Sequence, residues 1–266
     1  MKMNEQNYLL NIDAKLGLAN IPNNFIDLVL TDPPYNISAD KNKLTKVGNK
    51  FVSPQKAWGE DFKDNWKNVD EYYDWLKPFI AEFVRVLKDD GTMLLFLDRK
   101  YTGLITHYIE KDFGLIFRNK IYFEKTNPIF SLRKSNYRST IEECLFFTKS
   151  KQYCFNFGEQ SEMKQIYKGS IGRSKKTKHP TEKYRWMIEP LVRIHSRENS
   201  CVLDAFSGSG TIISVAQQQG RNAIGFEMSE KLFEMAKARL ISEQLQFDFE
   251  YPKNNKKLNK KANKNG

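Results

Sequence analysis

The clearest feature of the chain is a set of short, continuously apolar runs, each led by a turn signal. They are Phe25–Leu30, Thr92–Leu97 (after a turn expected at Lys88–Gly91), Ser200–Leu203 and Ala223–Phe226. Strands of a parallel sheet that is covered on both faces form unbroken hydrophobic runs of this length, whereas strands with one wet face alternate. The four runs therefore predict buried parallel strands.

Between these runs lie segments whose apolar residues recur at helical spacing. They are Val69–Leu87, broken or kinked near Pro78, Arg99–Lys111, Glu182–Ser196, Thr211–Gln219 and Glu230–Leu240. Ile121–Lys125 and Glu142–Thr148 predict antiparallel strands near one edge. Alternating strands and helices predict an α/β fold with a doubly wound, largely parallel sheet and helices on both faces.

Length and composition favour one main core with a small attachment. The chain has 266 residues, of which 40% are hydrophobic and 13% aromatic, enough to bury a globular core. Two polar segments, Ser38–Asp61 and Ser150–Lys178, resist the strand-helix scheme. We expect a core of residues 1–149 and 179–245, an insertion of residues 150–178, and a disordered basic tail of residues 246–266.

The motif Asp32-Pro33-Pro34-Tyr35 directly follows the first apolar run. Two consecutive prolines cannot continue a strand ladder, so they fix the backbone beyond a strand end, where open α/β sheets bind ligands. Asp32 and the proline carbonyls supply acceptors, and Tyr35 supplies a flat apolar face. This set suits a planar base with an exocyclic amino group. Hydrogen bonds accepted from both N–H groups of the amine localise the nitrogen lone pair. The nitrogen can then attack the methyl group of a sulfonium in line.

A second motif, Asp204–Thr211 (DAFSGSGT), stands between an apolar run and a helix. Gly208 and Gly210 permit a tight turn, and the helix start offers N–H donors to an anionic group. Glu227, at the end of the next run, is placed to accept hydrogen bonds from ribose hydroxyls. The motif lacks the lysine of a phosphate-binding loop and the third glycine of a dinucleotide-binding loop. It therefore predicts a nucleoside cofactor without pyrophosphate.

Together the two motifs resemble the permuted (β) class of DNA amino-methyltransferases of restriction-modification systems. DPPY lies early in the chain and FSGSGT, preceded by HPTEK, lies late, and the likeness spans Asn7–Leu240. The resemblance implies S-adenosyl-L-methionine as cofactor and a Rossmann-like methyltransferase fold. It also requires the two motif loops to converge at neighbouring strand ends.

The resemblance implies roles for individual residues. Asp32, Pro33, Pro34 and Tyr35 are expected to contact the flipped base. A larger set from both motifs and from HPTEK is expected to bind the cofactor: Asp13, Thr181, Lys183, Asp204, Phe206, Ser207, Gly208, Gly210, Thr211 and Glu227. Thr181 and Lys183 are the expected contacts to its methionine end. Asp13 is the expected contact to its adenine, with a surface-loop acid as the alternative. Residues 150–178 correspond to the family's usual target-recognition region, which residues 38–61 are expected to assist.

The net charge of +11, from 43 Lys and Arg against 32 Asp and Glu, favours a polyanionic partner such as DNA. Two basic clusters are candidates for phosphate contacts, with a solvated surface as the alternative: Arg133, Lys134 and Arg138, and Arg173, Lys175, Lys176 and Lys178.

Other classes of protein are disfavoured. Cys144, Cys154 and Cys201 lack CxxC spacing, so we expect buried, inert thiols and no metal site. The start of the chain lacks the apolar core of a signal peptide, and no apolar run reaches the roughly 18 residues of a membrane span. We therefore expect a cytoplasmic, nucleoid-associated protein without membrane contact.

These patterns predict a site-specific enzyme that methylates adenine N6 in double-stranded DNA by base flipping. In the resembling family, Asp before the diproline is more usual in adenine enzymes and Ser in cytosine-N4 enzymes. The alternatives are a cytosine-N4 methyltransferase, a catalytically silent nucleic-acid-binding module, and an enzyme acting on RNA or a protein amide. A homodimer and a cognate restriction endonuclease are further partners to consider, without a stable complex between enzyme and endonuclease.

Overall fold

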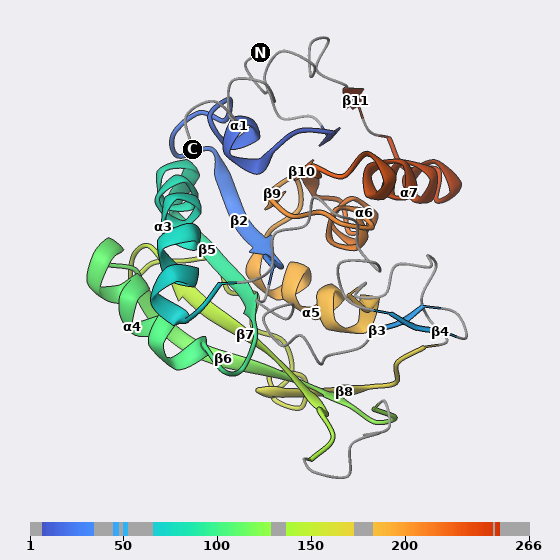
Figure 1. The fold of residues 1–266 in the computed structure, drawn as a ribbon. Helices are drawn as coiled ribbons and strands as arrows, with labels where there is room; N and C mark the ends of the chain where they lie inside the picture. Colours follow the sequence, from blue (N-terminus) through green and yellow to red (C-terminus); the bar gives the residue numbers. More distant parts are fainter. Residues whose placement is uncertain are drawn as a thin grey trace.

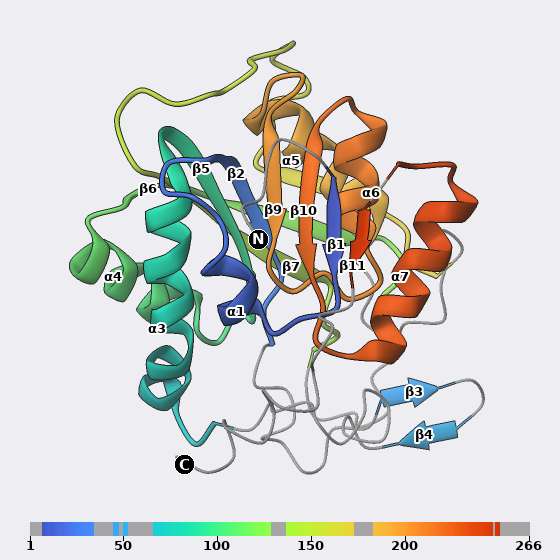
Figure 2. The ribbon, with the colours of Figure 1, turned by 90° about the horizontal axis from the view of Figure 1, so that it is seen from above.

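The computed structural model describes residues 7–34, 45–47, 50–52, 66–128, 137–172, 183–246 and 248–250. Within these residues, nine strands form one sheet in the order β11-β1-β10-β9-β2-β5-β7-β6-β8, and β3 and β4 form a separate hairpin. Helices cover both faces of the large sheet (Figure 1, Figure 2). The predicted doubly wound α/β fold is confirmed.

The strands of the large sheet run parallel to their neighbours, except that β7 is antiparallel to both β5 and β6. Their bounds are β1 Tyr8–Leu10, β2 Ile26–Thr31, β5 Leu87–Leu97, β6 Ile116–Lys125, β7 Ile141–Thr148, β8 Ile166–Gly169, β9 Cys201–Asp204, β10 Asn222–Phe226 and β11 Asp248–Glu250. The hairpin comprises β3 Thr45–Val47 and β4 Lys50–Val52. All four predicted parallel strands and both predicted antiparallel strands are present, with shifted ends.

In the described part of the chain, six helices form the two outer layers. One face of the sheet carries α1 Ala14–Leu18, α3 Val69–Val86 and α4 Thr102–Phe113, and the other carries α5 Arg185–His195, α6 Thr211–Gln218 and α7 Glu230–Ser242 (Figure 2). Of the break or kink expected near Pro78, the break is absent, because α3 runs continuously through the proline. Its buried residues lie on both sides of the proline, from Tyr72 to Val86, so packing on the sheet supports the helix across it.

Two hydrophobic cores result, one on each face of the sheet. Val29 and Leu95 belong to the core under α3, whereas Leu28 and Leu94 belong to the core under α5 and α6. Successive side chains of a strand point to opposite faces, so a strand in the middle of such a sandwich must be apolar throughout. This explains the unbroken apolar runs in the sequence.

Three expected segments contain a strand or part of one. The turn expected at Lys88–Gly91 lies inside β5, as an irregularity where the register with β2 shifts, because pairing resumes on both sides of it. The range expected to be a disordered tail contains β11, which pairs with β1 and satisfies the polar backbone groups of that strand. The range expected to be an insertion contains β8, which extends the sheet beside β6. Residues 251–266 lie outside the described residues.

The three cysteines are free thiols. Cys144 and Cys201 are buried as expected, but Cys154 is partly exposed. No helix in the described ranges combines the length and apolarity that a bilayer span requires.

The site is positioned by the two central strands β2 and β9, which are neighbours in the sheet. From β9 the chain passes through α6 to β10 on one side, and from β2 it passes through α3 to β5 on the other. Crossovers that leave in opposite directions open a crevice beyond the carboxyl ends of the two strands, where ligands bind in such sheets.

Candidate active site

The first candidate loop leaves the carboxyl end of β2. Asp32 follows the last residue of the strand and keeps 19% of its side chain exposed. Pro33 is buried and Pro34 is partly exposed. The prolines follow the strand end as predicted, since neither can donate to a ladder. Tyr35, the predicted stacking residue, lies outside the described residues.

The two predicted motifs meet at this edge of the sheet. The register pairs Leu28 with Val202 and Val29 with Leu203, so β2 and β9 end together. Just beyond, the hydroxyl of Thr31 donates a 2.8 Å hydrogen bond to Oδ1 of Asp204. The convergence of the two loops, which the predicted chemistry requires, is therefore present.

The glycine-rich loop between β9 and α6 turns sharply. Gly208 and Gly210 have φ angles of 51° and 74°, a region that favours glycine. The backbone N–H of Ser207 donates to the carbonyl of Phe226 on β10 at 2.9 Å. A Cβ atom added at Gly210 would lie 3.1 Å from Cβ of Ala236 on α7. The loop is thus held closely between a strand and a helix.

Arg239 of α7 holds the same loop in place through hydrogen bonds. Its buried guanidinium donates to the carbonyl of Ser209 at 3.0 Å and to Oγ1 of Thr211 at 2.7 Å. Glu243 faces it as an ion-pair partner at 3.5 Å. Sequence reasoning missed this residue, because an arginine on an amphipathic helix usually indicates the solvent face.

Glu227 lies one residue beyond β10 and closes the loop on its other side. Its Oε2 accepts the backbone N–H of Gly208 at 2.8 Å, and its Oε1 accepts that of Ser229 at 2.7 Å. Each carboxylate oxygen has two lone pairs, so the group can also accept hydrogen bonds from ligand hydroxyls. This is the position at which a ribose-binding acid was predicted.

Both acids of this site have unusual proton affinities. Burial raises the pKa of Asp204 to about 7, although hydrogen bonds from Thr31 and the backbone of Phe206 oppose the rise. Burial also raises the pKa of Glu227 to about 7, against the backbone hydrogen bonds it accepts. An incoming cation would stabilise the ionised forms of both groups. The electrostatics of the loop therefore favour a positively charged ligand.

Asp13 lies at the same edge of the sheet. The strand before it, β1, ends at Leu10, whose carbonyl accepts the backbone N–H of Glu227 at 3.0 Å. The Asp13 side chain accepts the N–H of Lys15 at 2.8 Å and caps α1. The residue is thus near the predicted cofactor residues, where its carboxylate serves as a helix cap.

Lys183 was expected at the methionine end of the cofactor, but the structure places its ammonium group beside Asp32. Nζ lies 2.8 Å from Oδ2 of Asp32 and 2.9 Å from Oε2 of Glu142. It also lies 4.9 Å from the centre of the Phe96 ring. Only 8% of the side chain is exposed. Thr181, the other predicted contact from HPTEK, lies outside the described residues.

Glu142, near the start of β7, is a candidate that sequence reasoning did not single out. Its carboxylate is shared by Lys183 and Lys125, the latter at 2.7 Å. Burial alone would raise the pKa of Glu142, but the two ammonium groups lower it to about 2. The one sequence signal is that two acids, Glu142 and Glu143, stand near the start of an otherwise apolar strand.

An aromatic cluster supports the cofactor side. The ring of Phe206 lies 5.2 Å from that of Phe79 and 6.0 Å from that of Trp75, both on α3. Trp66 and Tyr72 extend the cluster beneath them. Phe206, a predicted cofactor residue, therefore joins the glycine-rich loop to α3.

Among the residues predicted to contact phosphates, Arg138 lies in the described part of the chain. Its guanidinium donates to the carbonyl of Pro128. The other members of both basic clusters lie outside the described residues.

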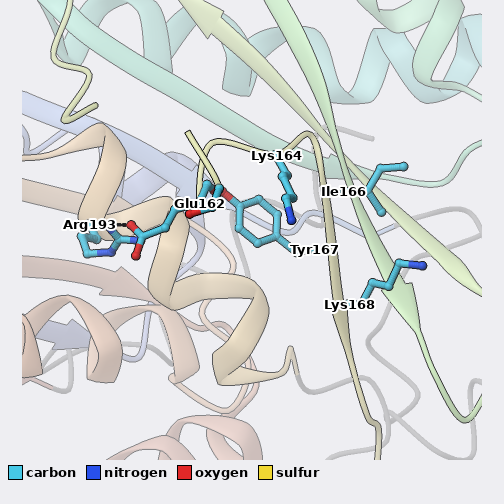
Figure 3. Close-up of a pocket in the computed structure, with 7 residues that line it drawn as sticks. Glu162, Lys164, Ile166, Tyr167, Lys168 and Arg193 are labelled. Atoms are coloured by element: carbon cyan, nitrogen blue, oxygen red, sulfur yellow. Dashed lines mark hydrogen bonds and ion pairs between the residues drawn. The ribbon is translucent and has the colours of Figure 1, made fainter. Parts of the chain in front are cut away.

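A separate cavity of about 420 Å³ is bordered by residues of β8, α5 and the segment before β8: Ser161, Glu162, Lys164, Ile166, Tyr167, Lys168 and Arg193 (Figure 3). Glu162 and Arg193 form a 3.2 Å ion pair at its margin, and none of the described residues that line it belongs to a motif.

Comparison with known sequences identifies relatives of this arrangement. A model of the DNA methylase family matches residues 26–238, a range that includes both motif loops. The Type II methyltransferase M.HpaI of Haemophilus parainfluenzae is 30% identical in an alignment 260 residues long that covers 90% of this chain and 76% of that protein. M.HinfI of Haemophilus influenzae is 27% identical, covering 88% of this chain and 68% of its own length.

Solved structures share the fold. The M1.HpyAVI–SAM complex has a TM-score of 0.64 and 25% identity, covering 88% of this chain and 99% of that one. The PvuII DNA methyltransferase, named as cytosine-N4-specific, has a TM-score of 0.70 at 18% identity, covering 90% of this chain and 89% of that one. That second likeness concerns the fold alone. Because the family model spans most of the chain and both motif loops meet at one sheet edge, this protein belongs to the DNA methylase family.

Proposed function

We propose that the protein transfers the methyl group of S-adenosyl-L-methionine to N6 of adenine at specific sites in double-stranded DNA. The observation that carries this proposal is the hydrogen bond between Thr31 and Asp204, which joins the Asp32 loop to the glycine-rich loop. A base inside a duplex cannot reach such a crevice, so the target adenine must be flipped out of the helix.

The cofactor side has a suitable set of donors and acceptors. S-adenosyl-L-methionine carries two positive charges and one carboxylate, and Asp204 and Glu227 are buried acids that a cation would stabilise. The start of α6 offers backbone N–H groups to the carboxylate, and Glu227 is placed for the ribose hydroxyls. When bound, the cofactor supplies an electrophilic methyl carbon on a sulfonium. A phosphate-bearing cofactor would instead face repulsion from both acids.

Asp32 is the catalytic residue on the base side. Its carboxylate and a proline carbonyl accept hydrogen bonds from the two N–H groups of the adenine amine, and these hydrogen bonds localise the lone pair on nitrogen. As the nitrogen–carbon bond forms, the carbon–sulfur bond breaks with its electrons on sulfur. Asp32 then receives the proton that the nitrogen loses on becoming a secondary amine. Tyr35 is proposed to stack on the ring.

Adenine rather than cytosine is proposed because Asp32 precedes the diproline, as is more usual in the adenine enzymes that the motif resembles. The test incubates the purified protein with labelled cofactor and DNA from a methylase-deficient host, followed by mass spectrometry of the nucleosides. N6-methyladenine is expected. N4-methylcytosine would transfer the proposal to the cytosine alternative.

A matched pair of variants tests the mechanism. Asp32→Ala should abolish transfer, whereas Asp27→Asn, on the same strand but paired with Lys88 away from the crevice, should retain it. Equal transfer by wild type and Asp32→Ala contradicts the assigned role. DNA binding without transfer by the wild type favours a silent binding module. Parallel incubations with RNA and with protein identify an enzyme of different substrate class.

Target recognition is proposed to reside in residues 150–178, assisted by residues 38–61. What supports this is the direction of β8, which follows from its parallel pairing with β6. Counted through β7 and β5, β8 runs parallel to β2, so Gly169 and Asp32 lie toward the same edge of the sheet. Single-molecule sequencing of DNA from one host that expresses wild type and another that expresses Lys164→Ala would show whether this segment determines the methylated site.

A further inference from the structure

We propose that Glu142 is a positioning residue of the methyl-transfer site and acts on Asp32 through the ammonium group of Lys183. The inference rests on the methyltransferase function proposed above. Its basis is a chain of three ion pairs that ends at the catalytic carboxylate. Lys125 lies 2.7 Å from Glu142, Glu142 lies 2.9 Å from Lys183, and Lys183 lies 2.8 Å from Asp32.

This row of ion pairs lies within the packed sheet and not on its solvated surface. Lys183 and Glu142 expose 8% and 21% of their side chains, and the Phe96 ring lies against the ammonium group of Lys183. Attraction between charges that are shielded from water is strong, and long side chains held in this way lose their freedom to reorient. Lys183 is therefore fixed at one place between two carboxylates.

Sharing the ammonium group has a chemical consequence for Asp32. The carboxylate must remain ionised and must still accept a hydrogen bond from the base. A lysine paired with Asp32 alone would compete with the base amine for that carboxylate. Glu142 draws part of the ammonium charge away, so Lys183 orients Asp32 without neutralising it. The four groups carry two charges of each sign, which makes their shared burial tolerable.

The same sheet offers a matched comparison. Lys168 of β8 and Glu124 of β6 form an ion pair of 2.9 Å, but their side chains are 63% and 37% exposed. A solvated pair of this kind contributes little to stability. Glu124→Gln is thus a control for the loss of one carboxylate from a lysine pair.

The experiment compares wild type, Glu142→Gln, Lys183→Met, the double variant and Glu124→Gln. Single-turnover methyl transfer is measured at saturating DNA and cofactor, cofactor affinity is measured by tryptophan fluorescence, and folding by thermal unfolding. Glu142→Gln should lower the transfer rate about 10- to 100-fold with cofactor affinity unchanged. Lys183→Met should lower it at least as far, and adding Glu142→Gln to it should cause no further loss. Glu124→Gln should behave as wild type.

Two results overturn the proposal: transfer by Glu142→Gln at the wild-type rate, or losses that multiply in the double variant. If Glu142→Gln does not bind cofactor or does not fold, a second variant combines Glu142→Gln with Lys125→Met and so replaces a charged pair by a neutral one. Its transfer rate is measured in the same way, and the same two results overturn the proposal. Absence of transfer by wild type would defeat the proposed function itself. A normal wild type with a normal Glu142→Gln defeats the positioning role alone.

Discussion

Thr31 and Asp204 are 173 positions apart in the chain, yet they share a 2.8 Å hydrogen bond between fully buried side chains. One ends the strand that carries the Asp32 loop, and the other ends the strand that carries the glycine-rich loop. Loss of one partner would leave a buried polar group unsatisfied. The bond therefore couples the proposed base site to the proposed cofactor site.

Thr31→Val is expected to weaken cofactor binding. The substitution keeps the shape of the side chain but removes the donor to Asp204, at a cost of about 1–3 kcal/mol, or roughly 5- to 150-fold in affinity. Trp75, near Phe206, provides the fluorescence signal for the titration. The control is Thr92→Val on β5, whose buried hydroxyl has no hydrogen-bond partner within the described part of the chain. Equal affinities for Thr31→Val and Thr92→Val would contradict the coupling.

The cofactor-free protein is expected to lose stability as the pH rises toward 8. The pKa values of Asp204 and Glu227 are about 7 in the folded protein, against about 4 for such groups in an unfolded chain. Groups with a raised pKa contribute stability that is complete below about pH 4 and is lost as the pH rises through about 7. Urea midpoints of wild type should therefore fall between pH 5 and pH 8. Those of Asp204→Asn should fall less, and parallel slopes would refute the assignment.

Cofactor affinity should show the opposite dependence on pH. The positive charges of the cofactor favour the ionised acids, so binding releases protons and the dissociation constant of wild type should decrease from pH 6 to pH 8. Calorimetry in two buffers of different ionisation enthalpy would measure the proton release. Asp204→Asn should bind more weakly and release fewer protons. A wild-type affinity that does not vary over this range would count against a cationic ligand.

Gly225→Ala should disturb the cofactor loop from the neighbouring strand. A Cβ atom at Gly225 of β10 would lie 2.5 Å from Oγ of Ser207, so the serine must move. We expect weaker cofactor binding, partly restored by Ser207→Ala in the same chain, because that change removes the obstructing oxygen. Gly103→Ala in α4 meets no atom within 4 Å and should be neutral or slightly stabilising. A Gly225→Ala variant with normal affinity would show that the loop tolerates displacement.

Arg239→Met should lower both stability and cofactor affinity. The variant removes the donor to Ser209 and Thr211 and leaves the buried Glu243 without this partner, at a cost on the order of 3 kcal/mol. Chemical denaturation measures the first effect and fluorescence titration the second. Lys237→Ala, on the same helix but paired with the half-exposed Glu234, should change neither. Loss of stability without loss of affinity would limit Arg239 to a structural role.

The parts of the fold and site that could be predicted are those encoded locally. Buried strands such as Ile26–Thr31 show as apolar runs, and the loops after them show as prolines or glycines that limit backbone geometry. β1 and β11 were missed because each is only three residues long and is stabilised by pairing with a neighbouring strand. The contacts of Lys183, Glu142 and Arg239 were missed because they depend on which strands and helices are adjacent, and no spacing in the chain records that adjacency.

The pairing of β1 with β11 has a consequence for the order of the motifs. Because Tyr8 lies opposite Asp248, two segments from far apart in the chain run side by side. A crossover linker from the end of β11 back to the start of β1, with a new opening at the exposed turn around Asn199, would yield a rearranged polypeptide. It would begin with β9 and the glycine-rich loop and end after α5. Every strand would keep its neighbours in such a protein. The sequence order of base site and cofactor site is thus a matter of where the polypeptide is cut, while the chemistry resides in the adjacency of β2 and β9.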